Sequence, residues 1–298
     1  MYAIEHFLHS SLHFQITLIA FLMAFIAYLV AYIYFVKQRS GKSPHLSVSL
    51  KETLIKVADA IFAVAFLLSI SLFIMSWVEA GRPPFRTLYE TLIYIIVCFS
   101  TISFVAQMVF KVRIFGLLNS LIVLGVFVYA LQQRDVERAT LMPALQTWVM
   151  IPHVTAYIIG YSGLAVAGVS SALYLISPNN LKGYWAFSDE ETIDYSNYTY
   201  PIVKFGFLFL TIGLLLGSWW GQEAWSNYWG WDPKENWALI SWFAFASYFH
   251  LKHIKAWGER KLAWVILIGV AAVLFTYLGM KFLPKDVQDA SLHIYIED

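Results

Sequence analysis

Long apolar runs alternate with short polar segments along the chain, and this pattern predicts helices that cross a membrane. A bilayer core about 30 Å thick needs roughly 20 apolar residues of helix. Nearly all of the runs are apolar on every side, as helices surrounded by lipid are. The eight expected spans are residues 14–36, 54–77, 88–110, 114–131, 154–176, 203–218, 234–252 and 262–282. The sequence therefore predicts an all-α membrane protein with about eight transmembrane helices in one domain, residues 1–298.

The positions of lysine and arginine predict the orientation, because cytoplasmic loops carry an excess of both. Placing the loop 37–53 in the cytoplasm puts thirteen basic residues on the inside: Lys37, Arg39, Lys42, Lys51, Lys56, Lys111, Arg113, Lys182, Lys204, Lys252, Lys255, Arg260 and Lys261. Seven then lie outside: Arg82, Arg86, Arg134, Arg138, Lys234, Lys281 and Lys285. This topology puts both termini on the outer face, together with the loops 78–87, 132–153 and 219–233.

The composition supports a membrane protein and gives no sign of a nucleic-acid partner. Of 298 residues, 59% are hydrophobic and 13% are charged, whereas a soluble domain has about 25% charged residues. The net charge of +1 comes with no basic tract. The single cysteine, Cys98, excludes an intrachain disulfide and a cysteine-based metal site. The first residues lack the basic start and short apolar core of a cleavable signal peptide, so we expect the first span to direct insertion.

One outer stretch, residues 218–237, concentrates tryptophan and is called the tryptophan segment below. It holds six of the twelve tryptophans: Trp219, Trp220, Trp225, Trp229, Trp231 and Trp237. An aromatic belt at the membrane surface explains one or two tryptophans at a helix end, but not five within thirteen residues. Indoles offer rigid faces for stacking and N–H donors, which a flat apolar macrocycle would use. The segment indicates either a planar ligand or an elaborate belt.

Asp232 has its own interpretation within this segment. The run Asp232-Pro233-Lys234-Glu235 matches a helix start, with Asp at the N-cap, Pro at the first position and Glu reaching back as in a capping box. Such a cap contributes about 1 kcal/mol. We expect capping to be the main role of Asp232, ahead of direct contact with a ligand.

Three histidines lie where an iron ligand would be useful. His153 follows Pro152 at the outer mouth of the fifth span, and His293 lies in the outer tail. Two neutral imidazoles on either side of one plane commonly hold a haem iron, although either residue alone would more often be an interfacial histidine. His250 lies within the seventh span, about 25 Å along the helix from Pro233. An ionisable residue at membrane depth is a functional candidate with an expected partner; a histidine bonded to a carbonyl near the inner interface is the alternative.

Four outer arginines are candidates to meet the propionates of a haem. Arg82 and Arg86 lie in a loop made rigid by Pro83 and Pro84, and arginine binds carboxylates in a two-pronged manner. A stiff hairpin between the second and third spans is the favoured interpretation of this loop. Arg134 and Arg138 are weaker candidates on the same side.

The run from Trp220 to Trp237, with Trp-Gly-Gln-Glu-Ala-Trp followed by Tyr-Trp-x-Trp-Asp-Pro-Lys-Glu-x-Trp, resembles the WWD signature of the haem-handling proteins of cytochrome c maturation. These are CcsA, also called ResC, and the related CcmC and CcmF. The loop Gly-Arg-Pro-Pro-Phe-x-Thr-Leu-Tyr-Glu and the eight expected spans make the chain most similar to CcsA. The resemblance covers roughly residues 54–298.

The resemblance implies a set of site residues. His153 and His293 match the axial ligands of haem b at an external site, formed with Trp220, Trp225, Trp229, Trp231, Asp232 and Trp237. His250 matches the ligand of a second haem site at membrane depth. In the family the other ligand of that site comes from the partner protein CcsB. The chain has no CcsB-like domain, so that ligand would come from a partner chain or from the other half of a fused protein.

The implied activity is that of a holocytochrome c synthase, or haem lyase, subunit of system II. It would attach haem vinyl groups to the thiols of a CxxCH motif in apocytochrome c, at a bacterial inner membrane or thylakoid membrane, with the tryptophan segment facing the periplasm or lumen. A CcmC-like exporter that loads haem onto a chaperone is the alternative, which eight spans rather than six disfavour. An electron-transfer cytochrome b would need histidine pairs inside the bilayer, whereas this chain has only one deeply placed histidine, His250. A ligand-free aromatic belt would leave the clustering of tryptophan and histidine unexplained.

Overall fold

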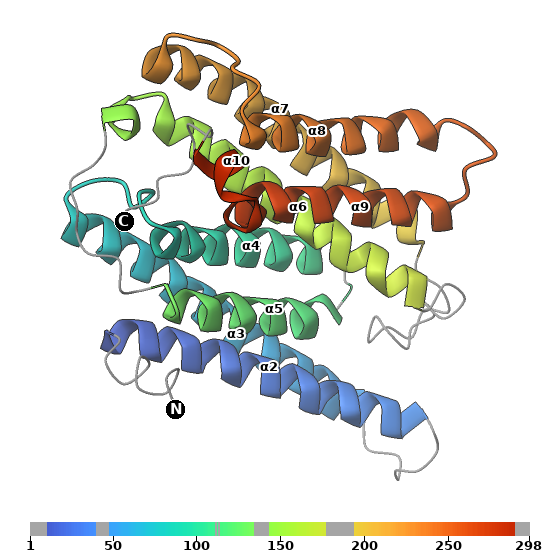
Figure 1. The fold of residues 1–298 in the computed structure, drawn as a ribbon. Coiled ribbons are helices and arrows are strands. Elements are labelled where there is room, and N and C mark those ends of the chain that lie inside the picture. Colours follow the sequence, from blue (N-terminus) through green and yellow to red (C-terminus); the bar gives the residue numbers. More distant parts are fainter. Residues whose placement is uncertain are drawn as a thin grey trace. The chain divides into compact units, whose positions relative to one another are not determined.

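The computed structural model describes residues 11–39, 48–110, 112, 114–133, 143–176 and 194–289. These residues form helices and connecting turns, with no strand among them, so the prediction of an all-α membrane protein is confirmed. The long helices in chain order are α2 (Leu12–Arg39), α3 (Val48–Ala80), α4 (Leu88–Phe110), α5 (Ile114–Leu131), α6 (Met150–Ile176), α7 (Tyr195–Trp225), α8 (Pro233–Lys252) and α9 (Glu259–Leu278) (Figure 1). Short helical turns are η1 (Pro143–Gln146), η2 (Gly279–Phe282) and α10 (Lys285–Asp289).

The helices pack into two compact units, and the grouping of both in one membrane domain stays a prediction. The first unit comprises residues 1–140 and 179–198, and the second comprises residues 141–178 and 199–298. In the first unit α2 packs against α3 and α5, and α4 packs against the same two helices. Aromatic rings fill the centre of this bundle, with Phe14 edge-on to Phe127 at 5.1 Å and Phe21 edge-on to Phe62 at 5.7 Å.

A buried polar group ties three helices of the first unit together. The Tyr28 hydroxyl donates to Asp59 Oδ1 at 2.7 Å, and Gln107 Nε2 donates to the same oxygen at 2.6 Å and to the Tyr28 hydroxyl at 2.7 Å. Gly116 of α5 lies directly against this group, and a Cβ at this position would clash with the Tyr28 ring. Polar side chains inside an apolar bundle must be bonded to one another to avoid a large desolvation cost.

In the second unit, the backbones of α6 and α7 approach each other closely. A Cβ on Gly160 of α6 would lie 2.8 Å from the Leu210 nitrogen, and one on Gly206 of α7 would lie 3.0 Å from the Leu164 nitrogen. Small residues at both positions let two membrane helices pack backbone to backbone. Helices α8 and α9 lie antiparallel, and α9 also packs on α6 (Figure 1). This packing fixes the register of α6 against α7, where the candidate site lies.

Seven of the described helices are long and apolar enough to cross a membrane, namely α2 to α7 and α9. The remaining expected span is α8, which is helical over 20 residues but less apolar. Its first turn carries Lys234, Glu235 and Asn236, and its interior includes Trp, Tyr and His residues. Whether α8 crosses the membrane, and with it the placement of both termini on the outer face, stays a prediction.

Two helix boundaries near the candidate site differ from the expected ones. Helix α6 begins at Met150 rather than at residue 154, so His153 lies in its first turn. Pro152 is tolerated there because the first turn needs no N–H from it. Helix α7 continues to Trp225, beyond the expected end at residue 218. The first part of the tryptophan segment is therefore helical, and its loop runs only from Ser226 to Asp232.

Candidate functional site

The His153 ring is oriented by a hydrogen bond to the backbone of α7. Its Nδ1 lies 2.9 Å from the carbonyl oxygen of Gly213. A carbonyl oxygen only accepts hydrogen bonds, so Nδ1 carries the proton and Nε2 carries the lone pair. Histidines that ligate metals commonly donate their other ring N–H to a carbonyl in this way, which fixes the tautomer and strengthens the ligand.

Three neighbours hold the His153 ring in place. The Trp220 indole stacks on it with ring centres 5.5 Å apart and planes 23° apart. Tyr157, one turn along α6, packs edge-on at 5.0 Å. On the third side, Gly217 of α7 leaves the space that the imidazole fills, since a Cβ there would lie 2.6 Å from His153 Cε1. The ring is thus fixed in position and in tautomer by α6 and α7 together.

Trp220 is itself fixed by the segment that precedes α6. Its indole Nε1 donates to the carbonyl oxygen of Ala144 in η1 at 2.8 Å. The Trp220 side chain is buried, and Trp225 packs against it at a centre distance of 4.8 Å. A buried indole usually has such a partner for its N–H. His153 therefore contacts the tryptophan segment through Trp220, and Trp225 packs on the Trp220 ring.

The other tryptophans of the segment lie in separate groups. Trp229 and Trp231 pack edge-on to each other at 6.1 Å, and Trp237 packs against Phe275 of α9 at 4.2 Å. Trp219 is turned to the surface, where it packs edge-on against Trp148 at 5.0 Å. The tryptophans therefore do not form one continuous surface, because residues 219–225 are helical and successive side chains point to different faces of α7.

The start of α8 confirms the predicted capping box. Asp232 is the N-cap, its carboxylate accepts from the backbone N–H of Lys234 at 2.7 Å, and Pro233 follows at the first helical position. In return, Glu235 Oε2 accepts from the backbone N–H of Asp232 at 3.1 Å. The Asp232 side chain is buried at this helix start. It positions the loop before α8.

Replacing Asp232 by alanine is expected to lower the free energy of unfolding by about 1 kcal/mol, because the first backbone N–H groups of α8 lose their acceptor. Asp232→Asn is expected to retain most of the stability, since asparagine is an equally good N-cap. Thermal or denaturant unfolding of the purified variants measures both changes. Equal stability of wild type and Asp232→Ala would contradict the capping role.

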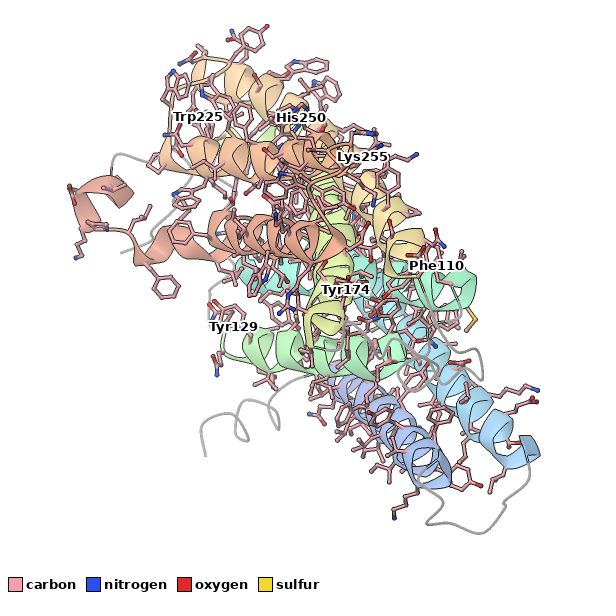
Figure 2. The ribbon with its side chains drawn as sticks, turned by 90° about the vertical axis from the view of Figure 1, so that its right-hand side faces the viewer. Phe110, Tyr129, Tyr174, Trp225, His250 and Lys255 are labelled. Carbon is pink, nitrogen blue, oxygen red and sulfur yellow. The ribbon has the colours of Figure 1, made fainter. Side chains whose placement is uncertain are left out.

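The two other histidine predictions have different outcomes. His293 lies outside the described residues, so its place beside His153 stays a prediction. His250 is exposed near the C-terminal end of α8, with Lys255 beyond it (Figure 2). Trp225, at the end of α7, lies toward the other end of α8 (Figure 2). Among the described residues, no hydrogen-bond partner of its ring is found. The partner that a histidine at membrane depth would need is not supplied by that part of the chain.

Arg82 forms an ion pair within its own loop, which agrees with the interpretation of the loop as a stiff hairpin. Its two terminal nitrogens bond the two carboxylate oxygens of Glu90 at 2.9 and 3.1 Å. The same carboxylate accepts from the backbone N–H groups of Arg86 and Thr87 at 2.7 and 3.2 Å. These bonds close the loop onto the start of α4. Arg134 and Arg138 lie outside the described residues.

Several residues of the site carry only weak signals in the sequence. Tyr157 follows His153 by four residues, which places both on one face of a helix, and this spacing is visible. Gly213 and Gly217 share a face of α7 for the same reason, but only the packing of α7 on α6 gives them a role. The contact of Trp220 with the Ala144 carbonyl joins residues 76 apart in the chain, and no local sequence pattern predicts it.

Comparison with known proteins gives the family. Residues 85–287 match the family described as Cytochrome C assembly protein. A Chlamydomonas reinhardtii protein named cytochrome c biogenesis protein CcsA is 35% identical over 257 residues, covering 84% of this chain and 70% of its own. The chain belongs to the cytochrome c assembly family. The resemblance found in the sequence is thereby confirmed.

Two further similarities extend this result. A CcsA protein from Synechocystis sp. is 30% identical over 306 residues, covering 82% of this chain and 89% of its own. Among solved structures, one named cytochrome c heme lyase CcmF superposes with a TM-score of 0.62 at 15% identity. The match covers 90% of this chain but only 47% of that one. At this identity the likeness establishes that this cytochrome c assembly protein shares the CcmF fold.

Proposed function

We propose that this cytochrome c assembly protein binds haem b beside the outer end of α6, with His153 Nε2 as one axial ligand of the iron. The observation that carries the proposal is the 2.9 Å contact between His153 Nδ1 and the Gly213 carbonyl. It places the proton on Nδ1 and so leaves Nε2 as the ligating nitrogen. Haem iron is held in this way by neutral histidine in many proteins.

The tryptophans would hold the flat faces and edges of the macrocycle. Trp220 and Trp225 lie against the His153 ring or against each other, and Trp229 and Trp231 project from the following loop. Aromatic stacking contributes about 0.5–1.5 kcal/mol per pair beyond the burial of apolar area. His293 of the outer tail is proposed as the second axial ligand. Trp237 and Asp232 would support the site from α8 rather than touch haem.

The proposed reaction is covalent attachment of haem to apocytochrome c. Each thiol of a CxxCH motif adds across one haem vinyl group, so that an S–C bond forms and the thiol hydrogen ends on the other vinyl carbon. This addition consumes no external oxidant, and the substrate thiol is the nucleophile. The part played by this chain is to hold one reactant in a fixed orientation, which can lower a barrier by several kcal/mol.

We further propose that His250 ligates haem at a second site at membrane depth. Its exposed ring and the lack of a hydrogen-bond partner in the described part of the chain suit a site completed by another protein, of the CcsB type. The protein would act in a bacterial inner membrane or a thylakoid membrane, with the tryptophan segment on the periplasmic or lumenal side.

Haem binding is tested directly with the full chain purified in detergent. Addition of haem is expected to give a Soret band with the α and β bands of a low-spin, histidine-ligated iron after reduction. The absence of a saturable spectral change would remove the proposal altogether. A high-spin spectrum would instead leave His153 as the sole strong ligand and contradict the assignment of His293.

Coexpression separates a synthase from a haem exporter of the CcmC type. With a CcsB-type partner and an apocytochrome c, a synthase yields covalent haem that survives denaturing electrophoresis with haem staining. An exporter yields none. His250→Ala is expected to reduce the covalent product and added imidazole to restore it; wild-type yield in this variant would remove the membrane-depth site.

A further inference from the structure

One carboxylate holds the backbone on both sides of Trp231. Glu235 Oε2 accepts from the N–H of Gly230 at 2.8 Å and from the N–H of Asp232 at 3.1 Å. The carbonyl oxygen of Trp231 itself accepts from the Asn236 side chain at 3.0 Å. Three hydrogen bonds from the first turn of α8 thus surround a single residue of the loop.

The residue held in this way has an unfavourable backbone conformation. Trp231 has φ of +57°, in the left-handed region that is costly for a bulky side chain and that glycine adopts without penalty. Its indole is also 68% exposed, more than that of any other tryptophan in the described part of the chain. Burial therefore does not explain why a tryptophan occupies this position.

Helix capping accounts for only part of the Glu235 contacts. A capping box needs the bond from Glu235 to the N–H of Asp232, which is the N-cap. The bond to Gly230 lies two residues before the N-cap and adds nothing to the helix. The second bond holds the backbone of Gly230 as well as that of Asp232, and so restrains the conformation of the intervening Trp231.

We propose that Glu235 is a positioning residue, which holds Trp231 in the left-handed conformation so that its indole is displayed to the haem. This inference rests on the proposed function of the site. Glu235 acts only through Trp231. The two hydrogen bonds of Glu235 to Gly230 and Asp232, called the clamp below, set the direction of the indole before haem binds. This lowers the entropy cost of ordering the side chain on binding.

A double-mutant cycle tests the coupling in the full chain purified in detergent. Glu235→Ala and Trp231→Ala are each expected to raise the Kd for haem about threefold to tenfold, the effect of losing one ordered aromatic partner. The double variant is expected to bind no more weakly than Trp231→Ala alone. Glu235→Gln is expected to bind like wild type, because its amide oxygen accepts the same two N–H groups. Effects that multiply in the double variant would overturn the proposal.

A substitution at Trp231 separates display from stability. Trp231→Gly removes the left-handed strain, so its melting temperature is expected to equal or exceed that of wild type while its Kd for haem rises as in Trp231→Ala. A Trp231→Gly protein that is less stable and binds haem normally would mean that Trp231 is a structural residue.

A readout without haem keeps the clamp testable if haem does not bind. In protein labelled with 5-fluorotryptophan, the Trp231 fluorine resonance is identified by its loss in Trp231→Phe. Glu235→Ala is expected to shift and broaden this resonance, and Glu235→Gln to leave it in place. An unchanged resonance in Glu235→Ala would refute the clamp, whereas a haem-free spectrum in wild type would refute the proposed function alone.

The start of α4 supplies the control, because Thr87 and Glu90 form a capping box there: the Glu90 N–H donates to the Thr87 hydroxyl at 3.1 Å and the Thr87 N–H donates to Glu90 Oε2 at 3.2 Å. Glu90 Oε2 also accepts two backbone N–H groups, but from the adjacent residues Arg86 and Thr87, with no residue between them. Glu90→Ala removes this cap together with the Arg82 ion pair, so it is expected to lower the melting temperature at least as much as a lost cap does and to leave the Trp231 resonance unchanged. A shift of that resonance in Glu90→Ala would show that general destabilisation, and not the clamp, moves Trp231.

Discussion

His153→Ala is expected to lower the affinity for haem on the order of 100-fold or more. Loss of a partner that merely orients a metal ligand costs 10–100-fold, and this change removes the proposed ligand itself. The variant leaves a space between Gly217 and Trp220 where the imidazole lay. Added imidazole is therefore expected to restore part of the affinity and the low-spin spectrum. Absorption titration of the purified chain with haem measures both effects.

The control for this variant is His253→Ala. His253 is exposed at the end of α8 and has no proposed role in the site. It is expected to bind haem with wild-type affinity and spectrum. If His153→Ala also retained the wild-type Kd and band positions, the assignment of the axial ligand would be wrong even though haem binds.

Gly217→Ala is expected to have the next largest effect, although the residue touches no proposed ligand atom of the iron. The added Cβ would lie 2.6 Å from His153 Cε1 and 2.9 Å from Nδ1, closer than any real contact. The ring must move, so its bond to the Gly213 carbonyl is lost. We expect a 10–100-fold loss of haem affinity and a stability loss of about 1–3 kcal/mol from overpacking.

Gly125→Ala of α5 is the matched substitution. A Cβ at Gly125 meets nothing within 4 Å, and alanine favours a helix by about 1 kcal/mol over glycine. This variant is expected to be as stable as wild type or more so, with unchanged haem binding. Haem spectra of Gly217→Ala that match those of Gly125→Ala would show that the His153 position is not critical.

The elements set by local chemistry were predictable from the sequence. The apolar runs gave the helices, and Asp232-Pro233-Lys234-Glu235 gave the start of α8, because each signal lies within one or two helical turns. The end of α7 was not predictable in this way. The apolar run ends at residue 218 and predicts a loop from residue 219, but contacts such as that of Trp220 with Ala144 support further turns of helix.

Two of the predicted site residues, His153 and Trp220, lie in contact, but the arrangement of the other tryptophans could not be predicted from the sequence. The predicted topology puts His153 and the tryptophan segment on one side of the membrane, and in the structure the His153 ring stacks on Trp220. The separation of Trp229, Trp231 and Trp237 from that contact depends on helix phase and on a loop conformation. The second bond made by Glu235 depends on the same loop, so a capping motif alone could not reveal it.

The close approach of α6 and α7 at Gly160 and Gly206 also bears on the proposed haem ligand, because it sets the register of the two helices. A slip of one helical turn, about 5.4 Å, would carry the Gly213 carbonyl away from His153 and move Trp220 off its ring. The Gly213 carbonyl would then no longer hold the imidazole proton on Nδ1, so Nε2 would no longer be fixed as the nitrogen with the lone pair. Under the proposed function, the nitrogen available to the iron therefore depends on the register of α6 against α7, and a chain with the wrong register would bind haem weakly.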